Sequence, residues 1–148
     1  MPSTHTSLFY HFVFSTKNRY PFLGSELRPT VHSYLGGILR DVGGIPLEIG
    51  GVADHVHVLS PLKPTQSVSA VLREMKRGSS EWIHHSLRVR KFAWQTGYGA
   101  FSVSPGDVPG VRRYISTQVQ HHSTRTFQEE YVEFLRRYGI DFDQAYLW

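Results

Sequence analysis

The sequence predicts an α+β protein: a ferredoxin-like or RRM-like split βαβ sandwich, whose antiparallel sheet carries helices on one face, with further helices at the C-terminus. The first observation is the hydrophobic periodicity of successive segments, which is typical of strands and helices in the order β-α-β-β-α-β along the chain. The second is the size, since 148 residues with 40% hydrophobic side chains suit one globular domain. We see no linker and no internal repeat, so we expect a single domain over residues 1–148.

The first half of the chain supplies three strands and a helix. Residues 8–15 are rich in aromatic and β-branched side chains, which favours a strand. A helical period begins at Ser25 and ends at the glycine pair 43–44. Two strands are then predicted at residues 45–50 and 51–60, and the glycines where they meet allow a tight turn or a bulge.

The second half begins with a helical pattern at residues 67–75. Gly78 interrupts this pattern, and residues 79–81 have the composition of a fresh helix cap. A fourth strand is predicted at residues 97–104 because small, aromatic and β-branched side chains alternate there. The sequence therefore predicts a helix broken at Gly78, followed by the last strand of the sheet.

Two helices are expected at the C-terminus. Pro109 suits the start of the first, whose apolar stripe runs from Val111 to His122. Thr126 and Glu129 have the spacing of a capping box that begins the second helix, and Gly139 is a natural residue to end it.

Composition limits the classes of function. The chain has no cysteine, which excludes disulfides and cysteine-ligated zinc and is compatible with a reducing cytosol. The first residues have neither the basic start nor the apolar run of a signal peptide, and no apolar stretch reaches the roughly 20 residues that a membrane span needs. We therefore expect a cytoplasmic protein with no membrane partner.

The formal net charge of +4 favours a polyanionic partner only slightly, but the basic residues are clustered. Lys76 and Arg77 lie together on a predicted helix, and Arg112 and Arg113 directly precede Tyr114. Cations near aromatic rings suit single-stranded nucleic acid. These four residues are our candidate DNA contacts, while a solvated helix face explains Lys76 and Arg77 about equally well.

The most informative motif is His55-Val56-His57. Residues two apart on a strand point to the same side, so the two imidazoles share a face. Two interpretations follow from the spacing: a pair of core histidines, or two ligands of a divalent cation, which would keep both rings neutral. Asp54 next to them is a supporting partner of the site, an additional metal ligand, or a cap or turn contact.

Tyr114 and Gln118 form a second candidate pair. Residues four apart on a helix lie on one side, so the hydroxyl and the amide project together. On spacing alone, packing of the tyrosine and solvation of the glutamine explain the pair. A cation near the tyrosine would activate it as a nucleophile, and an amide oxygen beside imidazoles suits Mg²⁺ or Mn²⁺. His121 lies on the Tyr114 side, and His122 falls with the buried stripe.

Taken together, these motifs resemble the single-tyrosine transposases of the His-hydrophobic-His (HUH) nuclease superfamily, of the insertion sequence 200/605 type. The resemblance covers nearly the whole chain. It rests on residues 12–17, 51–59, 76–80, 94–104, 114–118 and 121–122, which occur in the order and spacing of the family.

The resemblance implies a mechanism and a set of partners. His55, His57 and Gln118 correspond to the ligands of a Mg²⁺ or Mn²⁺ ion, and Tyr114 corresponds to the nucleophile. The tyrosine attacks single-stranded DNA at hairpin-bearing element ends and forms a 5′-phosphotyrosine, so strand transfer needs no nucleotide cofactor. Family members are homodimers, often with the tyrosine helix of one subunit serving the other's metal site.

Three alternatives are kept. The chain can be a relaxase-like nickase of the same superfamily, or a domesticated nuclease acting at hairpin repeats. It can also be a non-catalytic nucleic-acid-binding module, in which Tyr10, Phe12, Tyr98 and Phe101 stack bases on the sheet.

Overall fold

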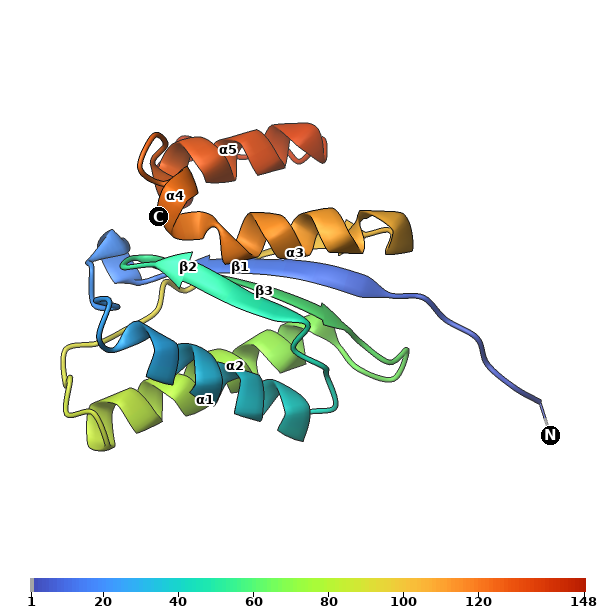
Figure 1. Cartoon of the computed structure of the whole chain (residues 1–148), viewed down its shortest axis with the longest axis horizontal. Helices are drawn as coiled ribbons and strands as arrows, with labels where there is room; N and C mark the ends of the chain where they lie inside the picture. The colour runs from blue at the N-terminus through green and yellow to red at the C-terminus, as the bar shows by residue number, and fades with distance from the viewer. Residues whose placement is uncertain (1) are drawn as a thin grey trace.

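The computed structural model describes residues 2–148 and has a sheet between two layers of helices (Figure 1). Within these residues the strands are β1 (Phe9–Ser15), β2 (Glu48–Val52), β3 (His55–Pro61) and β4 (Gly99–Val103). The helices are α1 (Arg28–Asp41), α2 (Val68–His85), α3 (Val108–Ser116), α4 (Gln118–His121) and α5 (Phe127–Arg137). Single 3₁₀ turns cover Lys17–Arg19, Pro105–Asp107 and Gln144–Tyr146.

The sheet is antiparallel, with strand order β2-β3-β1-β4. Helices α1 and α2 cover one face, and α3, α4 and α5 lie against the other (Figure 1). The predicted α+β class, the β-α-β-β-α-β order and the antiparallel sheet are confirmed. The C-terminal helices form a second layer, so helices cover both faces of the sheet.

Alternation along β1 and β3 divides their side chains between the two layers. Phe12 of β1 and Val56 of β3 point toward α1 and α2, where they belong to the larger apolar core. Val13 of β1 belongs instead to a smaller core under α5. Val13 pairs with His57, and directly paired residues point to the same face. The histidines of β3 therefore face the C-terminal helices.

The rings considered for base stacking do not form an open platform. Tyr10 and Phe12 pack in the core beneath α1 and α2, and Phe101 is 2% exposed in the core under α5. Tyr98 lies just before β4 and is 36% exposed. An open sheet face is what a stacking module of this type requires, and this fold covers it.

The predicted break at Gly78 is wrong, because α2 runs without interruption from Val68 to His85. Gly78 serves close packing instead: a Cβ there would lie 3.0 Å from Cδ1 of Ile38 on α1. Ser79 is fully buried inside the helix, where it donates to the Met75 carbonyl and accepts from Nε1 of Trp94. None of the described helices, α2 included, combines the length and the apolar character needed to cross a membrane.

The C-terminal helical segment divides where one helix was predicted. Helix α3 ends at Ser116, Thr117 has non-helical angles, and α4 begins at Gln118. The turn between β2 and β3 lies at residues 53–54 and not at the glycine pair. Gly50 instead lets α3 approach β2, since a Cβ there would lie 2.2 Å from the Ile115 carbonyl oxygen.

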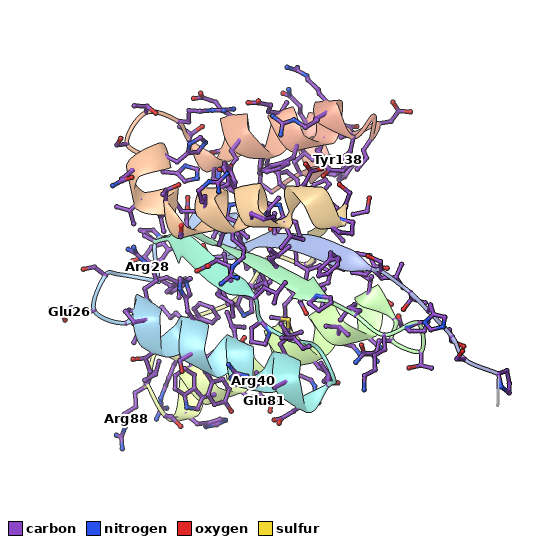
Figure 2. All side chains as sticks on the ribbon, turned by 45° about the vertical axis from the view of Figure 1, so that its right-hand side comes forward. Glu26, Arg28, Arg40, Glu81, Arg88 and Tyr138 are labelled. Atoms are coloured by element: carbon purple, nitrogen blue, oxygen red, sulfur yellow. The ribbon has the colours of Figure 1, made fainter. Side chains whose placement is uncertain are left out.

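Helix α5 is capped at its start and tied to the sheet just after its end. At its start, the Thr126 hydroxyl accepts from the Glu129 backbone N–H, as the predicted capping box requires. At its end, the Tyr138 hydroxyl donates to the Ser102 carbonyl of β4 at 3.1 Å; Figure 2 labels Tyr138 there. The inner face of α5 is therefore held over the histidines of β3.

Candidate metal centre and tyrosine site

The site begins with the two histidines of β3, which is an inner strand of the sheet. Both His55 and His57 are 0% exposed, and their ring centroids lie 5.0 Å apart. Strand alternation places them on one face, as the His-Val-His spacing predicts. Two buried imidazoles side by side would repel each other if both were protonated, so the rings are either neutral or bound to a shared cation.

Each ring is held through its Nδ1 atom. His55 Nδ1 lies 2.8 Å from Oδ1 of Asp54, and His57 Nδ1 lies 2.7 Å from Nε2 of His11 on β1. Asp54 therefore contacts His55, as expected for the first of the three roles considered for it, that of a supporting partner. Histidines that bind metals ordinarily donate their other N–H to such a partner, which fixes the tautomer. Both Nε2 lone pairs are then directed to the same space.

Oxygen atoms from the C-terminal helices complete this space. Oε1 of Gln118 lies 3.1 Å from His55 Nε2, so the structure brings together the three residues predicted as ligands. Oε1 of Glu130, from α5, lies 2.9 Å from His57 Nε2 and 3.6 Å from His55 Nε2. Sequence reasoning missed Glu130 as a site residue, since its spacing from the motifs carries no signal.

His122 adds a third imidazole. Its Nδ1 lies 2.7 Å from the Arg125 carbonyl and donates to it, which turns Nε2 toward the centre. Burial lowers the pKa of His122, but Glu130 outweighs that effect and raises it above the usual value. This Nε2 atom is buried, makes no hydrogen bond and lies 3.1 Å from Oε2 of Glu130. Ligand atoms of His55, His57, His122 and Glu130 all lie within 4.8 Å of one another.

The donor set fits a divalent cation. His122 Nε2 lies 3.1 Å from a carboxylate oxygen of Glu130, and His55 Nε2 lies 3.1 Å from the Gln118 amide oxygen, so nitrogen and oxygen atoms of four side chains face one space. Imidazole nitrogen combined with carboxylate and amide oxygen is a set that Mn²⁺ accepts. These residues therefore form a group that can hold a metal ion.

Burial sets the protonation of these groups. It lowers the pKa of His57 to about 4, against the opposing effect of Glu130, and it lowers the pKa of His11 well below its usual value. Burial alone would raise the pKa of Glu130, but contacts with His122, His57 and Tyr114 lower it. At neutral pH the site thus presents a neutral His57 beside an ionised carboxylate, which is the state that a cation binds.

Tyr114 lies at the edge of the same centre. Its hydroxyl donates to Oε2 of Glu130, and its ring centroid is 5.7 Å from that of His57. A cavity of about 250 Å³ opens beside it, between α4 and α5. Burial, and then the charge of Glu130, raise the pKa of Tyr114 above its ordinary value, so the phenol stays protonated until a cation is near.

The four predicted DNA contacts lie on two sides of the molecule. Lys76 and Arg77 are on α2, across the sheet from the histidines; Lys76 donates to the Gly97 carbonyl, and Arg77 pairs with acidic residues of its own helix. Arg112 lies 3.6 Å from Glu48, and Arg113 lines a hollow of about 570 Å³ that Tyr114 also lines. The arginines of α3 are the ones near the site.

Known structures share this fold. A candidate transposase from Deinococcus radiodurans R1 matches with a TM-score of 0.65 and 20% identity, over 80% of this chain and 96% of that one. A REP-associated tyrosine transposase bound to a REP hairpin matches with a TM-score of 0.60 and 16% identity, over 82% of this chain and 74% of that one. No curated protein matches the sequence.

The sequence itself matches the family described as "Transposase IS200 like" over residues 4–118. The match contains both histidines of β3 and both Tyr114 and Gln118, and it ends before α5. This chain therefore belongs to the IS200-like transposase family.

Proposed function

We propose that this chain is a DNA transposase that cleaves and rejoins single-stranded DNA at hairpin-bearing ends through Tyr114. His55, His57 and Gln118 would hold a Mg²⁺ or Mn²⁺ ion beside the tyrosine. The observation that carries the proposal is the carboxylate shared by the two halves of the site: Glu130 contacts both the His57 Nε2 atom and the Tyr114 hydroxyl. Membership of the transposase family supports a DNA-cleaving enzyme.

The reaction is a transesterification at phosphorus. The Tyr114 oxygen forms a bond to phosphorus, the bond from phosphorus to the 3′ oxygen breaks, and the tyrosine proton ends on that oxygen as a free 3′-OH. The DNA stays attached as a 5′-phosphotyrosine. A 3′-OH that attacks this phosphorus reverses the exchange and restores the tyrosine, so no high-energy cofactor is consumed. A bound cation would polarise the phosphate and stabilise the leaving oxygen.

The residues of this chain prepare the site for that exchange. Asp54 and His11 hold the two rings so that both Nε2 atoms face inward. Gln118 begins α4, which only Thr117 separates from α3, and this keeps its amide near the tyrosine that α3 carries. Arg113 lines the hollow next to Tyr114 and is suited to a DNA phosphate.

The partner we propose is single-stranded DNA that contains hairpins, in the cytoplasm of a bacterial or archaeal cell. The hairpin-bound neighbour of the same fold supports this class of partner. Two element ends require two tyrosines, so we further propose that two chains act together as a homodimer. Each chain would then contribute its own Tyr114.

Covalent trapping tests the proposal. The protein is incubated with single-stranded DNA from the ends of its own genomic locus, with Mn²⁺ or with a chelator, and run on a denaturing gel. We expect an adduct that requires Mn²⁺ and is lost in Tyr114→Phe. Tyr98→Phe is the matched control, since Tyr98 is a partly exposed tyrosine outside the site.

Hairpin binding, measured by gel shift, separates the remaining interpretations. Binding that persists in Tyr114→Phe while the adduct is lost supports the transposase. An adduct that forms in chelator, or equally in Tyr114→Phe, overturns the proposed nucleophile and its cation. Hairpin binding without any adduct in the unmodified protein points to the non-catalytic binding module.

A further inference from the structure

Helix α5 contributes a carboxylate to the centre, and we propose that Glu130 is a ligand of the divalent cation alongside His55 and His57. The inference deepens the proposed function and rests on it. Glu130 lies beyond residue 118, where the family match ends, so the match does not assign it. It would bind through Oε1, while Oε2 keeps its contact with Tyr114.

The first argument is geometric. Neighbouring ligands of an octahedral cation with bonds of about 2.1 Å lie roughly 3 Å apart. Oε1 of Glu130 lies 2.9 Å from His57 Nε2 and 3.6 Å from His55 Nε2. Oε1 of Glu130 therefore lies at about the spacing of a neighbouring ligand from each of the two histidine nitrogens, and all three atoms lie within 4.8 Å of one another.

The second argument is the burial of an unbalanced charge. The Glu130 side chain is 2% exposed, and among the described residues no lysine or arginine lies within 4.0 Å of it, only histidines. An ionised carboxylate removed from water is costly unless a cation or full hydrogen bonding compensates it. Tyr114 and Gln118 donate to Oε2, whereas Oε1 faces the histidine nitrogens, and a divalent ion at that place would supply the positive charge.

The third argument comes from the next turn of the same helix. Glu133 points outward, is 47% exposed and pairs with Arg125 and Arg137. The helix therefore has a glutamate that pairs with arginines at the surface and one that turns toward imidazoles in the interior. Only the interior one has no lysine or arginine within 4.0 Å among the described residues, and its neighbours are imidazoles, which are themselves common metal ligands.

The scaffold holds Glu130 rigidly. Phe127 and Tyr131, on either side of it, are buried in the core under α5, and the Phe127 ring stacks on His55 with centroids 4.3 Å apart. The position of the carboxylate is thus fixed by packing. Because Tyr114 donates to Oε2, the same residue sets where the nucleophile lies relative to the cation.

Titration of the protein with MnCl₂ by calorimetry, without DNA, is the first test. We expect one site per chain, an affinity about a hundredfold weaker in Glu130→Gln, and no change in Glu133→Gln, the matched control on the same helix. Equal affinity in Glu130→Gln and in the unmodified protein overturns the inference. Failure of the unmodified protein to bind Mn²⁺ overturns the metal-assisted function itself, so the two failures are distinguishable.

A second measurement uses the unmodified protein and does not depend on how a variant folds. The protein is prepared with ¹³C-labelled glutamate carboxyl groups, loaded with Mn²⁺ and examined by electron–nuclear double resonance. A directly bound carboxylate gives a strong ¹³C coupling, which we expect here and which should survive in Glu133→Gln. Nitrogen couplings from histidine without a carboxyl ¹³C coupling would show that Glu130 is not a ligand.

Discussion

Gly50 decides how closely the tyrosine helix approaches the sheet, and Gly50→Ala tests that role. A Cβ at this position would lie 2.2 Å from the carbonyl oxygen and 2.9 Å from Cγ2 of Ile115 on α3. The carbonyl is main chain and cannot rotate away as a side chain would. To bring the new Cβ and the Ile115 carbonyl oxygen to an ordinary van der Waals separation, α3 or the strand beneath it has to move by about 1 Å.

The magnitude follows from this displacement. Overpacking by one methyl group costs about 1–3 kcal/mol of unfolding free energy, and a cost of about 2 kcal/mol lowers the Tm of a domain of this size by roughly 4–8 °C. Tyr114 is the neighbour of Ile115, so it moves with the helix. A displacement of about 1 Å at a reacting group costs about a hundredfold in rate.

Thermal unfolding and the rate of Tyr114–DNA adduct formation measure the two effects separately. Gly110→Ala is the matched control, because Gly110 lies in the same helix and its Cβ would meet only the end of the Arg113 side chain at 3.9 Å. That variant should be more stable by about 0.5–1 kcal/mol, with unchanged cleavage. A Gly50→Ala protein with unchanged Tm and adduct rate would refute the close approach of α3.

Three further outcomes are expected. Asp54→Ala removes the acceptor that orients His55, so Mn²⁺ affinity measured by calorimetry should fall about 10–100-fold, and an unchanged affinity would contradict that role. Trp94→Phe removes the indole donor to buried Ser79 and should cost about 1–3 kcal/mol in urea unfolding. Burial, then Arg28, lowers the pKa of His32 in the folded protein to about 4. The unfolded state therefore binds a proton first, and stability should fall as pH drops from about 6.5 to 4, at up to about 1.4 kcal/mol per pH unit. His32→Gln should flatten this slope in thermal unfolding against pH, and an equal slope would contradict the assignment.

Local patterns predicted much of the fold because strand alternation and helix caps act over a few residues. The four strands lie where their apolar periods indicate, and the capping box at Thr126 begins α5. The His-Val-His motif predicts a shared face for the same reason, since its two rings are fixed by one strand. The predicted helix break at Gly78 was wrong because glycine also occurs where two helices pack closely. Here the close approach of Ile38 on α1 leaves little room for a Cβ at position 78.

The rest of the site depends on contacts between distant segments, which a local pattern does not contain. His11 meets His57 across 46 positions, through the register of β1 on β3. Glu130 meets His57 across 73 positions, through the packing of α5 on the sheet. In the sequence, His11 is one residue in an apolar strand and Glu130 one of several acidic residues in a helix. Only the tertiary arrangement distinguishes them from their neighbours.

The arrangement of the tyrosine also bears on how two chains would cooperate. Tyr114 contacts Glu130 of its own chain, and its ring lies 4.9 Å from that of His121 and 6.3 Å from that of His11. Moving α3 to a partner's site would break contacts to β1, α4 and α5 together. It would also pull on Gln118, only one residue after the break at Thr117. In the conformation described, Tyr114 therefore lies beside the candidate metal ligands of its own chain, and its use in a partner's site would require α3 to leave these contacts.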